Sequence, residues 1–224
     1  MDASSFPQLL INNRKLIKPV VKVKGKMSAI DLSPNNKAFT ADVYNNINRF
    51  SSFINDFKKT AGAELLFGGY GERREMYRRS ELFKESGASR NLHLGIDIWG
   101  DTGTLIFAPL DGTVHSFAYN GADGDYGAAI ILEHQLEGFS FFLLFGHLAL
   151  KDLNDLYSGK PVRQGDAFAQ FGKPSENGNW PPHLHLQLIL DIGDHSGDYP
   201  GVCAISESMK FLKNSPDPAV FTPI

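Results

Sequence analysis

The sequence has almost no cysteine, no long apolar run and no excess of basic charge. Cys203 is the only cysteine among the 224 residues, so an internal disulfide cannot form and nothing indicates an oxidising compartment. No apolar run approaches the roughly 18 residues that span a bilayer. Residues 1–15, MDASSFPQLLINNRK, lack the basic start and long apolar stretch of a secretory signal. We therefore expect a cytoplasmic protein without a membrane span.

The charge balance gives no reason to expect a nucleic-acid partner. Lys and Arg number 22 against 25 Asp and Glu, for a net charge of −3. The densest basic run, Glu72-Arg73-Arg74-Glu75, has an acid at each end, which indicates a solvated or substrate-shaping loop rather than a phosphate site. Tyr70, Arg73 and Tyr77 could contact a substrate from this loop, although a structural loop is the simpler interpretation.

The first 62 residues predict a small helical extension. Residues 19–27, PVVKVKGKM, alternate weakly like a short edge strand. Thr40 is a candidate helix cap and Gly62 a candidate stop, with Lys58 and Lys59 in the last turn. One amphipathic helix is expected between them, and its apolar face consists of Val43, Ile47, Phe50, Ile54 and Phe57. We expect an extension at residues 1–62 and a larger domain at residues 63–224.

The larger domain has the pattern of an antiparallel β protein. Apolar residues alternate with polar ones in short stretches that turn signals separate. Asp111-Gly112 and Glu137-Gly138 are typical of hairpin turns, and residues 150–159 predict a short helix. The expected fold is mainly β, an antiparallel sheet or sandwich-like core. The expected strands span residues 92–98, 104–108, 113–119, 128–134, 139–145, 167–171 and 183–190.

The stretch NWPPHLHLQLIL, residues 179–190, places two histidines in a strand that otherwise looks like core. Side chains alternate across a strand, so His183, His185 and Gln187 share one face while the leucines line the other. A surface strand with two solvated histidines is the simple alternative. The pair alone is weak evidence for a metal.

A second polar pair, His93 and Asp97, lies in HLGIDIWG, residues 93–100. In a straight strand these side chains stand about 13 Å apart, at roughly 3.3 Å per residue. One metal with ligand bonds of about 2 Å cannot bind both at that separation. A bend at Gly95 would bring them together, since glycine makes such a kink inexpensive.

The remaining histidines differ in context. His147 follows the apolar stretch FFLLFG in FFLLFGHLAL, and this context does not favour an exposed side chain. A buried histidine that donates to a backbone carbonyl is its structural alternative. His115, His134 and His195 have no partner pattern, so we expect them to be ordinary structural residues.

Three motifs together resemble the lysostaphin-type zinc endopeptidases, which cut peptidoglycan. These are His-x-x-x-Asp at 93–97, Gly-His-Leu at 146–148 and His-Leu-His at 183–185. HLGIDIWGDTGTLIFAPLDGTV and GKPVRQGDAFAQFG also resemble that family, and the likeness covers about residues 88–191. The resemblance implies a Zn²⁺ cofactor bound by His93, Asp97 and His185. It also implies that His147 and His183 assist an activated water, and that the substrate is a peptide or peptidoglycan-derived.

The sequence departs from the common family pattern beside the last motif. Trp180 and Pro181 stand where a small hydroxyl residue and glycine are usual, and Leu186-Gln187 replaces Phe-Glu. We expect Gln187 to weaken the outer support of a ligand. The Trp-Pro-Pro version resembles a branch that is also fused to larger cytosolic enzymes such as class-III aminotransferases.

Two other functions fit the same scaffold. A non-catalytic metal-binding or regulatory module is one, but such modules lose ligands and all five key residues are present here. A carrier or phosphotransfer domain is the other. A biotin carrier needs a lysine in a Met-Lys-Met turn, which is absent, and phosphohistidine transfer needs no ligand set completed by an aspartate.

Overall fold

A large β-sheet forms the centre of the computed structural model, which describes residues 5–85 and 88–223. The strands are β1 (Met27–Ala29), β2 (Leu65–Gly68), β3 (Lys84–Glu85), β4 (Ala88–His93), β5 (Ile96–Trp99), β6 (Leu105–Phe107), β7 (Gly112–Asn120), β8 (Gly127–Leu136), β9 (Phe139–Leu148), β10 (Pro161–Val162), β11 (Ala167–Gln170), β12 (His183–Ile189) and β13 (Val202–Ala204). The eight-stranded sheet has the order β1-β2-β5-β12-β9-β8-β7-β10. Within the described residues only β1 and β2 pair in parallel. The predicted mainly β, antiparallel fold is confirmed.

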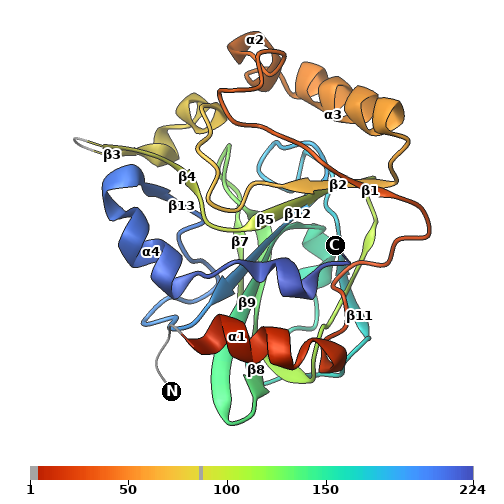
Figure 1. Cartoon of the computed structure of the whole chain (residues 1–224), viewed down its shortest axis with the longest axis vertical. Helices are drawn as coiled ribbons and strands as arrows, with labels where there is room; N and C mark the ends of the chain where they lie inside the picture. The colour runs from red at the N-terminus through yellow and green to blue at the C-terminus, as the bar shows by residue number, and fades with distance from the viewer. Residues whose placement is uncertain (1–4, 86–87, 224) are drawn as a thin grey trace.

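Smaller elements surround this sheet. The α-helices are α1 (Phe6–Asn12), α2 (Ala41–Tyr44), α3 (Ile47–Ala61) and α4 (Ser208–Asn214). Short 3₁₀ helices are η2 (Arg14–Leu16), η3 (Met76–Arg79), η4 (Glu81–Phe83), η5 (Leu150–Leu153), η6 (Ile205–Glu207) and η7 (Pro218–Phe221). Two further sheets, β13-β4-β3 and β11-β6, complete the strands. In Figure 1, α2 and α3 lie at one end beyond β1 and β2, and α1 lies at the other end.

The predicted single helix is two helices. The helix is interrupted at Asn45 and Asn46, between α2 and α3. The Asn46 side chain accepts from the N–H groups of Asn48 and Arg49, at 3.0 and 3.1 Å, so it caps a new helix instead of continuing the old one. Thr40 precedes α2 but makes no side-chain capping bond. Gly62 ends α3 with a φ of 60°, as predicted.

Residues before α2 pack into the main core. Phe6 contacts Phe141 with ring centroids 5.1 Å apart, and the N–H of Val20 donates to the carbonyl of Phe221. The edge strand predicted at residues 19–27 is displaced, because residues 19–26 form no strand and the edge strand β1 begins only at Met27. The division into residues 1–62 and 63–224 stays a prediction.

Of the two predicted hairpin turns, the one at Glu137-Gly138 is confirmed and the one at Asp111-Gly112 is wrong. Glu137 and Gly138 have φ values of 49° and 83° and join β8 to β9, as a hairpin turn requires. Asp111-Gly112 does not make a hairpin, because β6 pairs with β11 while β7 pairs with β10 and β8. The helix predicted at 150–159 is only η5, which ends where Asn154 turns extended. No clear sequence signal predicted α1, α4 or β2.

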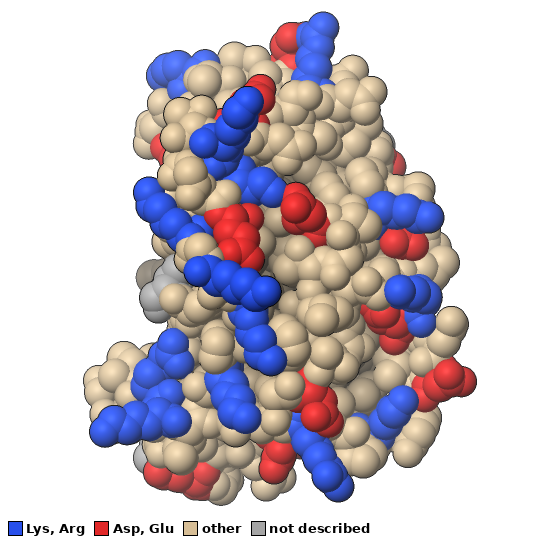
Figure 2. Space-filling view, turned by 90° about the vertical axis from the view of Figure 1, so that its right-hand side faces the viewer, with Lys and Arg blue, Asp and Glu red and all other residues tan. Residues whose placement is uncertain are grey.

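The described part of the chain holds no helix that could cross a membrane. Figure 2 shows acidic and basic side chains interspersed over one face.

Candidate metal centre

The predicted bend at Gly95 is present. Leu94 and Gly95 separate β4, in the three-stranded sheet, from β5, in the large sheet. A Cβ atom on Gly95 would lie 2.6 Å from the carbonyl oxygen of Leu186 and 2.7 Å from Cε1 of His185. No larger residue fits this approach without a shift of the β12 backbone. The bend therefore turns His93 and Asp97 toward the same point.

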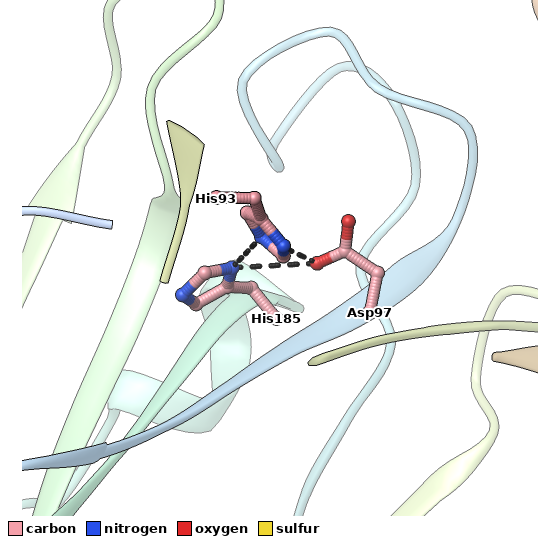
Figure 3. A group of neighbouring side chains, drawn as sticks. All are labelled: His93, Asp97 and His185. Carbon is pink, nitrogen blue, oxygen red and sulfur yellow. Dashed lines mark hydrogen bonds and ion pairs between the residues drawn. The ribbon is translucent and has the colours of Figure 1, made fainter. Parts of the chain in front are cut away.

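Three buried side chains meet at that point, His93 from β4, Asp97 from β5 and His185 from β12 (Figure 3). The Nε2 atom of His93 and the Nδ1 atom of His185 each lie 3.3 Å from Oδ1 of Asp97. The two nitrogen atoms are 2.8 Å apart. The structure thus brings together the three residues that the family resemblance designates as metal ligands.

Outer partners determine which ring nitrogens carry protons. Nδ1 of His93 lies 2.9 Å from the carbonyl oxygen of Gly69, and Nε2 of His185 lies 3.0 Å from Oε1 of Gln187. The Gln187 amide donates to Pro200 and Ser215, so its oxygen faces His185. Both outer ring nitrogens must donate, because their partners only accept. Gln187 therefore orients His185, contrary to the expectation that it weakens the outer support.

The inner atoms then form a cluster that suits a cation. In the neutral form of each ring, Nε2 of His93 and Nδ1 of His185 present lone pairs, and Oδ1 of Asp97 is buried without a hydrogen-bond partner. Lone pairs 2.8 to 3.3 Å apart repel one another unless a cation lies between them. Tetrahedral bonds of 2.0–2.1 Å put ligand atoms about 3.3 Å apart. The donor set fits a zinc ion with one open position.

Electrostatics set the charges that such an ion needs. Burial lowers the pKa of His93 to about 4, so its ring is neutral at pH 7. Burial alone raises the pKa of Asp97, but the positive charge of the bonded Arg74 helps to hold that pKa well below its usual range. Two imidazoles and one carboxylate are typical catalytic zinc ligands.

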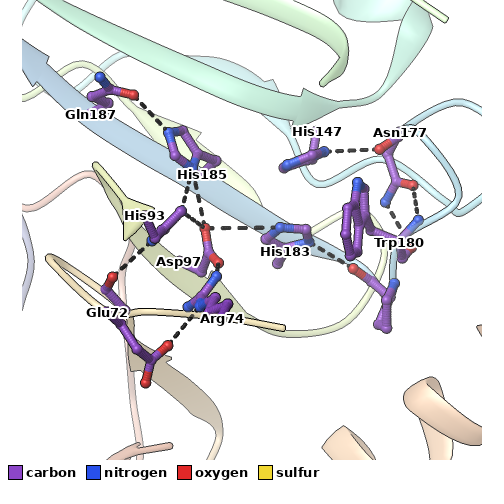
Figure 4. A network of polar contacts seen from close by, with 12 residues as sticks. Glu72, Arg74, His93, Asp97, His147, Asn177, Trp180, His183, His185 and Gln187 are labelled. Carbon is purple, nitrogen blue, oxygen red and sulfur yellow. Dashed lines mark hydrogen bonds and ion pairs between the residues drawn. The ribbon is translucent and has the colours of Figure 1, made fainter. Parts of the chain in front are cut away.

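His147 and His183 lie beside this cluster, with ring centroids 4.1 Å apart (Figure 4). Their Nδ1 atoms lie 2.8 Å from the carbonyl oxygens of Asn177 and Pro181, respectively. Each ring therefore donates through Nδ1 and keeps Nε2 as an acceptor. Nε2 of His183 is 3.9 Å from Oδ1 of Asp97.

Both of these histidines are neutral bases at pH 7. Burial lowers the pKa of His183 to about 4. Burial also lowers the pKa of His147, well below its usual value, and the neighbouring His183 adds to the effect. His147 has a φ of 63°, a strained conformation for a residue with a Cβ atom. This backbone turn and the bond to Asn177 aim its ring into the site.

Arg74 is a site residue that the sequence reasoning missed. We expected residues 72–75 to be a solvated loop, but Arg74 is only 1% exposed. Its Nη1 atom donates to Oδ2 of Asp97 at 2.5 Å, and its Nε atom donates to Oε2 of Glu72 at 2.6 Å. Arg73, one residue earlier, is more than half exposed and matches the expectation. When two arginines are adjacent, the sequence alone does not show which of them is buried.

Asn177, which is bonded to Trp180, also escaped sequence reasoning as a support of the site. The Asn177 side chain is fully buried and accepts from the N–H of Trp180, while its amide donates to the carbonyls of Gly172 and Trp180. The Trp180 ring stands edge-on to His147 and His183, with centroids 6.3 and 6.5 Å away. The unusual tryptophan thus forms one wall of the site.

The site opens into a cavity of about 190 Å³. Tyr77 lines it, whereas Tyr70 donates to the carbonyl of Ser215 instead. His195 is exposed at the same cavity and packs against Tyr199, with ring centroids 4.8 Å apart.

The other two histidines lie outside the cavity. His134 is buried and bonds to the carbonyl of Asp111 through Nδ1, as a structural histidine does. His115 bonds to the Ser116 hydroxyl. Neither lines the cavity.

Residues 91–196 match the model of peptidase family M23. Similar solved structures include the catalytic domain of lysostaphin from Staphylococcus simulans, at 20% identity and a TM-score of 0.41, covering 73% of this chain and 98% of that one. A point mutant of the catalytic domain of the prophage-encoded M23 protein EnpA from Enterococcus faecalis has 22% identity and a TM-score of 0.37, covering 50% and 78%. A zinc-containing peptidase from Vibrio cholerae has 23% identity and a TM-score of 0.35, covering 47% and 29%. No curated protein matches the chain.

Proposed function

We propose that this protein is a zinc-dependent endopeptidase that hydrolyses peptidoglycan-type peptides, because residues 91–196 match the model of peptidase family M23. The cluster of three potential ligand atoms carries this proposal, since two histidine nitrogens and a buried carboxylate oxygen converge within 2.8 to 3.3 Å of one another. His93, Asp97 and His185 would hold the ion. When bound, zinc supplies a Lewis acid that makes a water nucleophilic near neutral pH.

His183 and His147 carry the proton steps in this proposal. Nε2 of either ring can accept the proton of the attacking water, because both rings are neutral and donate through Nδ1 to backbone carbonyls. The water oxygen bonds to the peptide carbonyl carbon, the C–N bond breaks, and the proton passes to the leaving nitrogen. The imidazolium N–H also stabilises the negative charge that develops on the carbonyl oxygen.

The lining of the cavity suits a peptide substrate. Aromatic rings form much of its wall, and they come from Tyr77, Phe83, Tyr126, Trp180 and Tyr199. Such walls exclude water and pack on the apolar faces of peptide units. Asp125, Asp198 and the basic Arg90 also lie at the same cavity. Burial raises the pKa of the Asp125 carboxyl, and Asp198 adds to this shift.

The test measures turnover and zinc in the same samples. Peptidoglycan stem and cross-bridge peptides are incubated with the protein, and products are identified by mass spectrometry. His147→Ala and His183→Ala should keep zinc and lose on the order of 10²–10⁴-fold in kcat, the usual contribution of a general acid or base. His115→Ala, on a strand outside the cavity, is the matched control and should keep full turnover. Unchanged turnover in either of the first two variants would remove that histidine from the mechanism.

A further inference from the structure

Arg74 occupies a buried position directly behind the candidate metal centre (Figure 4). Its guanidinium group makes three hydrogen bonds, to Oδ2 of Asp97, to Oε2 of Glu72 and to the hydroxyl of Tyr77, at 2.5, 2.6 and 3.2 Å. A buried cation is costly unless it is paired in good geometry. The site therefore includes an arginine, bonded through Nε and Nη1, that the proposed reaction does not use.

Arg74 makes the two oxygens of the Asp97 carboxylate different. Oδ2 accepts from Arg74, whereas Oδ1 is buried without a hydrogen bond and lies 3.3 Å from each inner histidine nitrogen. Rotation of the carboxylate would break the bond to Arg74. The arginine thus selects the oxygen that faces the cation and favours binding through that oxygen alone.

We infer that Arg74 is a positioning residue of the metal centre, which holds Asp97 in its ligand orientation and thereby strengthens zinc binding. This inference rests on the proposed zinc site. It adds an outer partner from outside the segment that matches the family model, since Arg74 precedes residue 91.

The segment that carries Arg74 is itself fixed against the ligand strand. The N–H of Arg74 donates to the carbonyl of Asn91, and the N–H of His93 donates to the carbonyl of Glu72. Gly69, in the same segment, accepts from Nδ1 of His93, and a Cβ atom on it would collide with Nη2 of Arg74. Residues 69–74 therefore support two of the three ligands at once.

Glu72 completes the support. One of its carboxylate oxygens accepts from Arg74, and the other accepts from the N–H of Leu32 at 3.1 Å. The negative charge of Glu72 offsets the positive charge of Arg74, so Asp97 still contributes one net negative charge to the proposed zinc ion. A lysine could supply the charge of Arg74, but a single ammonium cannot reproduce the planar fork that bonds both carboxylates.

Zinc affinity tests this inference without any substrate. The natural protein, Arg74→Met, Arg74→Lys and the control Arg73→Met are titrated with zinc in competition with a chromophoric chelator. Visible absorption of the cobalt(II)-loaded proteins reports ligand geometry. Arg73 is the matched control because it is adjacent, exposed and paired with Glu75. Circular dichroism of the metal-free proteins confirms folding.

Arg74→Met should bind zinc about 10- to 100-fold more weakly, with an altered cobalt spectrum, because outer partners of metal ligands contribute on that scale. Arg74→Lys should be intermediate, and Arg73→Met unchanged. If Arg74→Met does not fold, the zinc affinity and cobalt(II) spectrum of Arg74→Lys test the inference instead. A folded Arg74 variant with natural affinity and an unchanged cobalt spectrum would overturn the inference and leave the zinc site standing. No zinc binding by the natural protein would overturn both.

Discussion

Each ligand side chain has an outer partner that selects the atom facing the centre. Gly69 selects Nε2 of His93, Gln187 selects Nδ1 of His185, and Arg74 selects Oδ1 of Asp97. Such partners set tautomer and orientation before a metal arrives, which lowers the cost of assembling the site.

Gln187 gives one test of this pre-orientation. Gln187→Ala removes the acceptor of the His185 N–H and leaves that group buried, so zinc affinity should fall about 10-fold or more. Isothermal titration with zinc measures the change. Gln164→Ala, at an exposed bond to Leu16, is the control and should bind zinc as the natural protein does. Equal affinities in all three proteins would show that the tautomer of His185 does not depend on Gln187.

His134 predicts a pH dependence of stability that does not involve the metal centre. Burial lowers its pKa to about 4 from an ordinary 6.5, and its Nε2 atom has no hydrogen-bond partner. The unfolded chain therefore binds a proton that the folded chain rejects, and this contribution to stability falls as pH drops from about 6.5 to 4. The full loss is about 3 kcal/mol.

His134→Gln should make the loss of folding stability between about pH 6.5 and 4 smaller than in the natural protein. Urea unfolding at pH values from 7 to 4 measures it, and the exposed His195→Gln provides the comparison. An identical pH profile for His134→Gln and the natural protein would contradict this role of His134.

At the scale of elements, the site depends on how β4, β5 and β12 meet. The parity of His183, His185 and Gln187 and the bend at Gly95 were predictable, because strand alternation and glycine geometry are local properties. The break at Asn46 was not, since the apolar period of 40–62 runs through it while a side-chain cap decides it. The burial of Arg74 depends on tertiary contacts with β4 and β5, which no local pattern encodes.

Gly95→Ala tests the bend. The added Cβ atom would meet the backbone of β12 and the His185 ring, so both stability and zinc affinity should fall. Gly138→Ala, in the β8–β9 turn with open space around it, should cost about 1–2 kcal/mol of stability from its positive φ and leave zinc affinity unchanged. Thermal unfolding and zinc titration of both variants make the comparison. Natural zinc affinity in Gly95→Ala would show that the bend is not required.

For the whole molecule, the proposed ligands link two sheets, because His93 comes from the three-stranded sheet while Asp97 and His185 come from the large one. Their order and spacing were available from sequence, but the sheet order that joins them is a long-range property. A cation that binds only the folded arrangement stabilises all of it through mass action.

Zinc should therefore raise the melting temperature. Free zinc at about 100 times its Kd contributes about 2.7 kcal/mol, which corresponds to roughly 5–10 °C for a chain of this size. Differential scanning calorimetry with zinc and with EDTA measures the shift, and magnesium serves as the control ion. An unchanged melting temperature with zinc and with EDTA would contradict the proposal that a bound metal links the two sheets.

The most direct measurement is the metal content of the purified protein and of His93→Ala by inductively coupled plasma mass spectrometry. We expect about one zinc ion per chain in the natural protein and almost none in the variant. Stoichiometric zinc in His93→Ala, or none in the natural protein after zinc loading, would contradict the proposed zinc centre.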